Sequence, residues 1–277
     1  MADLVADVMG HWLDRGADGW RLDAAYAVPA EFWAAVLPRV RDRHPAAYFV
    51  GEVIHGDYAE FVTASTMDSV TQYELWKAVW SSLNEGNFFE LDHALQRHNG
   101  FLDTFVPWTF LGNHDVTRLA SRLTDRRDIA LALTVLMTVG GTPAVYEGDE
   151  QAFQGVKEDR EHGDDAVRPP FPEKPDELAP YGWPTYRLHE ELIGLRRRHD
   201  WLHTARTRRV HLTNEEFVYE VSGSGRKLLV CLNIGDASAD LPVPHGRTVL
   251  HGTGWLTRSS QADAIVGLGP HSAAVIE

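Results

Sequence analysis

The apolar positions in the first two thirds of the chain predict helices and strands in turn. Val5, Val8, Met9 and Trp12 lie at i, i+3, i+4 and i+7, which predicts a helix with one apolar stripe. After this lone helix, strands and helices alternate about every 30 residues, a pattern typical of βα units in a parallel sheet. The predicted strands are 19–23, 46–52, 69–72 (the weakest), a segment within 105–115, and 142–146; the predicted helices cover about 29–43, 73–97 with a break near Gly86, 128–139, and a segment that includes 188–195.

The pattern changes after about Thr207, where no helical period is left. The segments 217–221 and 228–234 flank a Gly-Ser-Gly turn and predict a β-hairpin, and further short strands are predicted at 248–250 and 273–276. These features predict a small antiparallel β-sandwich. The sequence therefore predicts two domains, an α/β domain over 1–205 and an all-β domain over 206–277.

Composition and charge narrow the classes of function. The 277 residues include 26 Lys and Arg against 40 Asp and Glu, a formal net charge of −14. A polyanion would be repelled, so we expect neither nucleic acid nor an anionic membrane surface as a partner, whereas a neutral substrate is unaffected. No apolar run approaches the roughly 20 residues that span a bilayer. The first ten residues lack the basic start of a signal peptide, and the single cysteine, Cys231, is compatible with a reducing compartment, which together predict a cytoplasmic protein.

Three of the predicted strands end in a carboxylate: Asp23, Glu52 and Asp115. The carboxyl ends of parallel strands lie at the same edge of a sheet, which is where barrel enzymes place their active sites. The 29 residues from Asp23 to Glu52 correspond to about one βα unit, and the 63 from Glu52 to Asp115 to about two. We therefore expect the three acids to share one rim.

The neighbours of these acids suggest divided roles. Arg21 and Asp23 lie at i and i+2 and point to the same face of a strand, and a guanidinium there favours the ionised carboxylate that a nucleophile needs. Glu52 follows an apolar run, where partial desolvation favours a protonated acid. Paired carboxylates of this kind are typical of glycoside cleavage. Taken alone, each acid would more often be a helix cap, and His114 would more often be a loop residue; the cluster favours catalysis.

Four segments in order resemble glycoside hydrolase family 13, the α-amylase family. Residues 19–23 (Gly-Trp-Arg-Leu-Asp) are similar to its second conserved region, at the fourth barrel strand, and residues 51–53 (Gly-Glu-Val) to the third region, at the fifth strand. Residues 113–118 (Asn-His-Asp-Val-Thr-Arg) resemble the fourth region, at the seventh strand, and residues 141–150 the eighth-strand segment, although Tyr146 is followed here by Glu147 rather than by a second tyrosine. The resemblance covers about residues 1–205, and the sandwich matches the family's C-terminal domain.

The resemblance implies roles for named residues. Asp23 would attack the anomeric carbon, Glu52 would act as acid and then as base, and Asp115 would stabilise the distorted sugar. Arg21 would orient Asp23, and His114 would hydrogen-bond the sugar. These roles imply retention at an α-linkage, for which a carboxyl separation of about 5–5.5 Å is expected. His55 would contact the acceptor side or serve as a plain loop residue. Asp164, Asp165 and Arg168 would either shape the cleft or form a surface ion cluster.

The departures from the family concern the start of the fold. Nothing in the chain matches barrel strands one to three, the Asp-x-x-x-Asn-His segment of the third strand, or the domain that follows it. The resemblance therefore implies a partial (β/α)₈ TIM barrel, strands four to eight, followed by the sandwich. It implies an α-glucan or maltooligosaccharide substrate, with hydrolysis and transglycosylation both open, and no cofactor. Calcium belongs to the complete family fold, and its ligands are not identifiable here. An open five-stranded sheet exposes two edges, so a complementary N-terminal half-barrel partner, or a truncated chain, is the alternative to activity of this chain alone.

Overall fold

A computed structural model of the chain describes all residues except 171, 175–176, 178–179 and 259–263. In that part of the chain, none of the helices is both long and apolar enough to cross a membrane.

Five short strands run parallel to one another through the first half of the molecule. β1 (Gly19–Leu22), β2 (Tyr48–Gly51) and β3 (Ser69–Val70) form one hydrogen-bonded group, and β4 (Trp108–Phe110) and β5 (Thr142–Ala144) form another. A parallel bridge between Thr71 and Trp108 connects β3 to β4, so the order along the sheet is the order along the chain. The five predicted strands and their parallel arrangement are confirmed.

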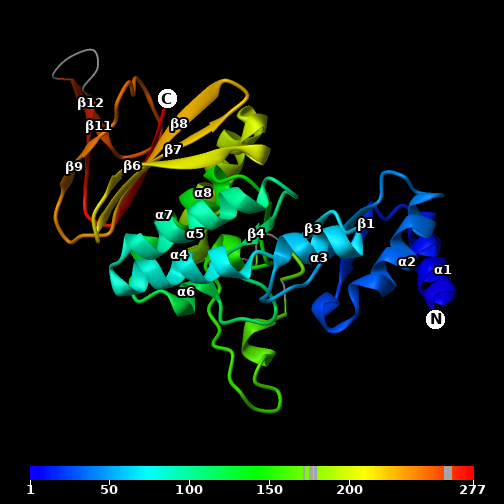
Figure 1. The fold of residues 1–277 in the computed structure, drawn as a ribbon. Helices are drawn as coiled ribbons and strands as arrows, with labels where there is room; N and C mark the ends of the chain where they lie inside the picture. Colours follow the sequence, from blue (N-terminus) through cyan, green and yellow to red (C-terminus); the bar gives the residue numbers. More distant parts are fainter. Residues whose placement is uncertain (171, 175–176, 178–179, 259–263) are drawn as a thin grey trace.

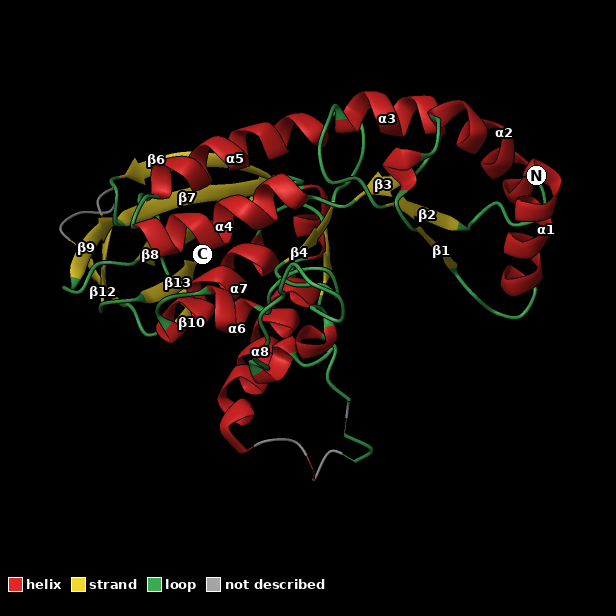
Figure 2. Cartoon of the chain, turned by 90° about the horizontal axis from the view of Figure 1, so that it is seen from below, coloured by secondary structure: helices red, strands yellow, loops and turns green. Residues whose placement is uncertain are grey.

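Helices connect these strands. α2 (Ala30–Arg41) and α3 (Tyr58–Ser65) lie along one side of β1, β2 and β3 (Figure 2). The predicted break near Gly86 is present, because Gly86 adopts a left-handed conformation (φ 62°) between α4 (Tyr73–Glu85) and α5 (Phe88–Phe101). Further helices are α6 (Leu119–Arg122), the strongly buried α7 (Ile129–Thr138) and α8 (Trp183–Arg198). α3 was not predicted, since Asp57 caps an eight-residue helix too short to show a clear apolar period.

The first helix, α1 (Ala2–Leu13), forms as predicted but buries a different face. Met9 and Leu13 pack against α2 and β2, and the indole of Trp20 donates to the Met9 carbonyl (3.3 Å). Val8 and Trp12 face outward, and Trp12 is 52% exposed. The expectation of one stripe through all four residues is therefore wrong in detail, because α2 covers only the side of α1 that carries Met9 and Leu13.

The C-terminal part of the chain forms two antiparallel sheets at the end of the molecule opposite α1 (Figure 1). The predicted hairpin consists of β7 (Glu216–Gly223) and β8 (Arg226–Asn233), and four strands were not predicted. One of these, β6 (Arg206–Leu212), reads Arg-Thr-Arg-Arg-Val-His-Leu, a polar edge strand without apolar alternation. The larger sheet has the order β10 (Val249–Gly252), β13 (Ser272–Ile276), β8 (Arg226–Asn233), β7 (Glu216–Gly223), β6 (Arg206–Leu212), and the smaller sheet has the order β11 (Trp255–Arg258), β12 (Ala264–Leu268), β9 (Ala239–Pro242).

The two parts of the chain share buried surface. One apolar cluster runs from α4, α5, α7 and α8 into β7, β8 and β13. The predicted division at 205/206 falls between a 3₁₀ helix (Asp200–Thr204) and β6, and it stays a prediction.

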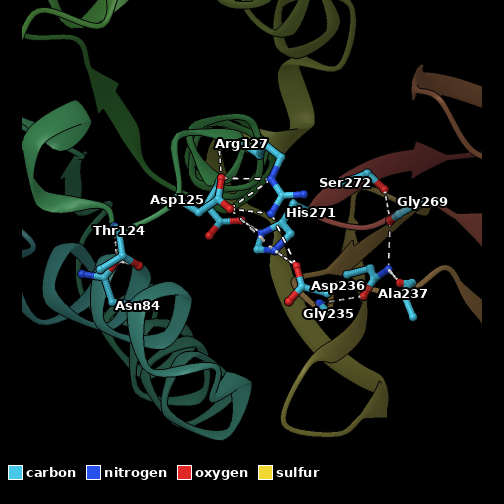
Figure 3. A network of polar contacts seen from close by, with 12 residues as sticks. Asn84, Thr124, Asp125, Arg127, Gly235, Asp236, Ala237, Gly269, His271 and Ser272 are labelled. Carbon is cyan, nitrogen blue, oxygen red and sulfur yellow. Dashed lines mark hydrogen bonds and ion pairs between the residues drawn. The ribbon is translucent and has the colours of Figure 1, made fainter.

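A polar network joins the start of α7 to two turns of the C-terminal sheets (Figure 3). His271 contacts the buried Asp128 carboxylate through Nδ1 (2.7 Å) and Asp236 through Nε2 (3.4 Å). Arg127 pairs with Asp125 (2.5 Å), and burial raises the pKa of Asp128 although His271 opposes the rise. The network therefore adds polar contacts between the helical part and the C-terminal sheets.

Candidate active site

The structure places the three predicted acids at the carboxyl ends of their strands. Asp23 directly follows β1, Glu52 directly follows β2, and Asp115 lies in the loop after β4. Because the strands are parallel and in chain order, these ends share one edge of the sheet. Asp23 is well exposed, with 81% of its side chain accessible, whereas the Glu52 side chain is only 8% exposed.

Arg21 joins the first two acids. Its Nη1 donates to Asp23 Oδ1, and its Nη2 lies 3.2 Å from Glu52 Oε2. A guanidinium between two carboxylates reduces their mutual repulsion. The backbone adds a second donor, because the N–H of Ala24 donates to Glu52 Oε2 (2.8 Å). Ala24 holds the left-handed conformation (φ 42°), which costs an alanine about 1 kcal/mol and aims this N–H at Glu52.

Tyr73 connects Glu52 to the loop after β4. Its hydroxyl lies 3.4 Å from Glu52 Oε1, to which it donates, and it accepts a bond from Asn113 Nδ2 (2.9 Å). Burial is the main cause that raises the pKa of Tyr73 to about 12, and Asn113 opposes the rise. The phenol is therefore a neutral donor at ordinary pH. Sequence reasoning missed Tyr73; its signal was its place directly after the weak strand prediction at 69–72.

Asp115 is held on two sides. His114 Nε2 lies 3.0 Å from Asp115 Oδ2, and Arg168 Nη2 lies 3.1 Å from Asp115 Oδ1. Arg168 Nε also donates to the backbone carbonyl of His114 (3.0 Å). The Asp115 N–H in turn donates to Asn113 Oδ1 (2.8 Å). These contacts fix the carboxylate in the loop after β4.

Asp164, Asp165 and Arg168, which would either shape the cleft or form a surface ion cluster, differ in their contacts. Arg168 reaches Asp115, and Asp164 pairs with Arg168 (2.7 Å). Asp165 lies 3.8 Å from the exposed His162. Arg168 and Asp164 are therefore linked to Asp115 and Asp165 pairs at the surface, and the cleft-shaping role stays a prediction.

An open pocket of about 270 Å³ lies over this edge of the sheet. Arg21, His114 and Tyr146 bring polar groups to it from the ends of three strands, while aromatic side chains form part of its wall. Asp23 and Glu52 adjoin it through Arg21. The lining residues are Arg21, Thr71, Tyr73, Trp108, Phe110, Gly112, Asn113, His114, Ala144, Val145 and Tyr146. A mixed aromatic and polar wall suits a sugar, whose ring faces are apolar and whose edges carry hydroxyls.

His55 lies on an exposed loop after Glu52. Its ring meets the ring of Tyr26 edge to face, with centroids 6.0 Å apart and planes at 85°. The backbone N–H of Tyr26 donates to the Glu52 carbonyl (3.3 Å), so this pair of rings is anchored beside Glu52. The acceptor-side role of His55 stays a prediction.

Among the residues that the structure describes, no group of three or more His, Cys, Asp or Glu side chains is arranged to hold a metal ion. We therefore assign no step of the chemistry to calcium, and the expectation that catalysis uses no cofactor stays a prediction.

A family model and several known proteins match this chain. The family model "Alpha amylase, catalytic domain" matches residues 2–174. Neopullulanase 2 of Thermoactinomyces vulgaris is 29% identical over 77% of this chain and 36% of its own length. A cyclomaltodextrinase of Geobacillus thermopakistaniensis is 25% identical over 86% of this chain and 40% of its own. A 4-alpha-glucanotransferase of Thermotoga neapolitana is 26% identical over 83% of this chain and 58% of its own.

Solved structures show the same fold at low sequence identity. The alpha-amylase from H. orenii superposes with a TM-score of 0.83 at 20% identity, covering 100% of this chain and 64% of that one. The Nostoc punctiforme debranching enzyme gives a TM-score of 0.80 at 20% identity, with 99% and 60% coverage. The chain spans about a third of the length of the first relatives named here.

Proposed function

Because this chain belongs to the alpha-amylase family of glycoside hydrolases, we propose that it cleaves α-glucosidic bonds in starch-type oligosaccharides with retention of configuration. The observation that carries the proposal is that Arg21 holds Asp23 and Glu52 together at the ends of adjacent parallel strands. Arg21 contacts both acids, but the Asp23 side chain is exposed whereas the Glu52 side chain is nearly buried. This is the division of environment that a nucleophile and an acid need.

In the first step, an Asp23 oxygen attacks the anomeric carbon. The bond from that carbon to the glycosidic oxygen breaks, and Glu52 gives its proton to the leaving oxygen. In the second step, Glu52 takes a proton from water, whose oxygen displaces Asp23 from the glycosyl ester. Two displacements restore the α-configuration. A carboxyl separation of about 5–5.5 Å is expected for this mechanism.

Asp115 and His114 would bind the hydroxyls of the distorted sugar. Arg168 supports this role because it holds the carboxylate of Asp115 and the backbone of His114 at once. Tyr73 would orient Glu52 through its hydroxyl. Such fixed donors and charges act most strongly where charge develops in the transition state.

A transglycosylase is the alternative within the same chemistry. The glycosyl ester on Asp23 is common to both reactions, and only the acceptor in the second step differs. The relatives include both hydrolases and a glucanotransferase by name. The His55–Tyr26 pair would lie on the acceptor side, where a sugar hydroxyl competes with water.

A second candidate concerns how the site is completed. We propose that the five strands correspond to barrel strands four to eight and the two antiparallel sheets to the C-terminal domain of the family. Within the part of the chain that the structure describes, β1 pairs with β2 alone and β5 with β4 alone. A groove of about 350 Å³ lies beside β5, and its lining is half apolar (Met137, Pro143, Val145 and Ile193) and half polar (Arg196, Arg197, Asp200 and His203). The outer edges of β1 and β5, unpaired among the described residues, favour the alternative in which a complementary N-terminal half-barrel closes the sheet.

The experiment follows fluoride release from α-D-glucosyl fluoride and sugar release from maltotriose. Fluoride leaves without a proton from Glu52, so Glu52→Gln should keep the first step on the fluoride and lose maltotriose cleavage by at least about 100-fold. Added azide should then yield α-glucosyl azide, identified by NMR. Asp23→Asn should abolish both reactions, while Glu31→Gln, an exposed change on α2, should match the parent chain.

The same assays are run with and without the N-terminal barrel half of Thermoactinomyces vulgaris neopullulanase 2. Turnover only after mixing would support the second candidate. Turnover that survives Asp23→Asn, or a β-configured azide product, would refute the retaining assignment. Absence of turnover under both conditions would refute the proposed function of this chain.

A further inference from the structure

Arg118 is a cation in the interior beside the candidate active site. It lies three residues after Asp115, and its side chain is 0% exposed. It is the largest of the fully buried side chains that the structure describes. Burying a charge costs several kcal/mol unless the charge is paired and hydrogen-bonded. The contacts of Arg118 must therefore offset the cost of burying its charge.

The guanidinium of Arg118 holds several separate groups. Its Nε donates to the Val167 carbonyl (3.0 Å), and its Nη1 donates to Asp149 Oδ1 (3.0 Å) and to the Glu147 carbonyl. Its Cζ lies 4.0 Å from the centre of the Tyr146 ring, a cation–π contact. Only a planar fork with several donors makes such contacts at once, so lysine is not an equivalent.

The loop after β4 is shaped to receive this pair. A Cβ added at Gly112 would lie 2.3 Å from Asp149 Oδ2, so the glycine makes room for the carboxylate that pairs with Arg118. Burial raises the pKa of Asp149 to about 6, and Arg118 opposes the rise. The backbone is joined here as well, because the Arg118 N–H donates to the Gly155 carbonyl (3.0 Å).

Two of the segments that Arg118 holds continue into the site. Tyr146 lines the pocket, and Val167 directly precedes Arg168, which binds both Asp115 and the His114 carbonyl. We propose that Arg118 is a positioning residue, which fixes the loops after β4 and β5 so that His114, Asp115 and Arg168 are held in their reactive arrangement. This inference rests on the proposed function for its kinetic consequence, although the arrangement itself can be measured without turnover.

The test compares the buried Arg118 with the half-buried Arg196. Arg118→Met removes the contacts above. Arg196→Met is the control, because the Arg196 side chain likewise donates to several backbone carbonyls (Met137, Val139 and Gly141) and has no hydrogen bond to Asp115, His114 or Arg168. Arg118→Lys restores the charge beside Asp149 without the fork.

The first readout is kinetic, on whichever form of the enzyme cleaves maltotriose. Per folded molecule, Arg118→Met should lower kcat by about 100-fold with KM changed less than about threefold, the size expected for a displacement near 1 Å. Arg118→Lys should recover thermal stability but not kcat. Because Arg196 also lines the groove beside β5, its kcat is compared per folded and fully assembled molecule; on that basis Arg196→Met should lose stability and keep kcat. Equal kcat in the parent and Arg118→Met would overturn the inference, as would recovery of kcat in Arg118→Lys.

The second readout needs no turnover. The ring signals of His114 in a ¹³C-histidine-labelled chain, assigned with His114→Gln, should shift in Arg118→Met and stay in place in Arg196→Met. Unchanged His114 signals in Arg118→Met would overturn the inference even if the chain were inactive. Inactivity of the parent chain, with shifted His114 signals, would refute the proposed function and leave the positioning role supported.

Discussion

His98 makes the stability of this protein depend on pH between about 6.5 and 4. It lies on α5 with no exposed surface, where its Nε2 donates to the Gly140 carbonyl (2.7 Å). Its Nδ1 accepts from Gln72 Nε2 (3.3 Å). Gln72 directly precedes Tyr73, and Gly140 lies just before β5, so this one ring links α5 to the segments that lead into Tyr73 and β5.

The structure gives the size of the effect. Burial lowers the pKa of His98 from 6.5 to about 4, because the interior penalises the charged ring, and the Gly140 carbonyl opposes the change only in part. The unfolded chain binds the proton more readily, so this contribution to stability is fully present above pH 6.5 and is lost progressively as the pH falls from 6.5 to about 4. A change of about 2.5 pH units corresponds to about 3 kcal/mol in full, and to about 2 kcal/mol at pH 5.

The assay is urea unfolding followed by circular dichroism at pH 8 and pH 5. His98→Gln keeps a donor for Gly140 and cannot titrate in this range. We expect the free energy of unfolding of the parent chain to fall by about 2 kcal/mol more than that of His98→Gln between the two pH values. Asp149, whose pKa is raised to about 6, contributes with the opposite sign in this range, and it cancels in the difference between the two chains.

His93 supplies the control, since it lies on the same helix and is exposed. His93→Gln should lose stability with pH as the parent chain does. If His98→Gln and the parent chain lost the same free energy between pH 8 and pH 5, the buried, neutral ring could not be the cause, and the reasoning would be refuted.

Three further predictions concern single contacts. Tyr73→Phe removes the hydroxyl between Glu52 and Asn113 and should lower kcat/KM for maltotriose about tenfold; an unchanged value would exclude a role for this hydroxyl in orienting Glu52. Arg196→Met leaves three carbonyls without their donor and should reduce the free energy of unfolding by about 2–4 kcal/mol in urea, whereas the exposed Arg197→Met should change it by less than about 0.5 kcal/mol. His271→Ala removes the donor to the buried Asp128 and should cost about 1–3 kcal/mol in the same assay, and a loss below 0.5 kcal/mol would show that the contact in Figure 3 does not stabilise the junction.

The strand pattern and the acids at the strand ends were predictable from the sequence. Apolar runs of four to seven residues, each followed by a polar motif, place Asp23 and Glu52 correctly because β1 and β2 end one residue before them. That information is local, and the parallel arrangement then follows from the alternation of strands and helices. The break at Gly86 was predictable for the same reason, since a glycine ends a helix by its own backbone freedom.

Elements with little local signal were not predictable. α3 is too short for a helical period to show, and β6 carries four polar residues among its first five because one of its edges faces solvent. The face of α1 was predicted wrongly, since the choice between Trp12 and Leu13 as the buried side depends on where α2 packs.

By itself, the sequence determined which residues are candidates for chemistry and at which edge of a sheet they gather, because periodicity and strand ends are properties of neighbouring residues. Only the tertiary structure decided which other groups act on them. Arg168 reaches Asp115 from 53 positions along the chain, Tyr73 joins Glu52 to Asn113, and Arg118 holds Asp149 from 31 positions away. Such contacts depend on how loops after different strands fold over one another, and no local pattern of polar and apolar residues contains that geometry.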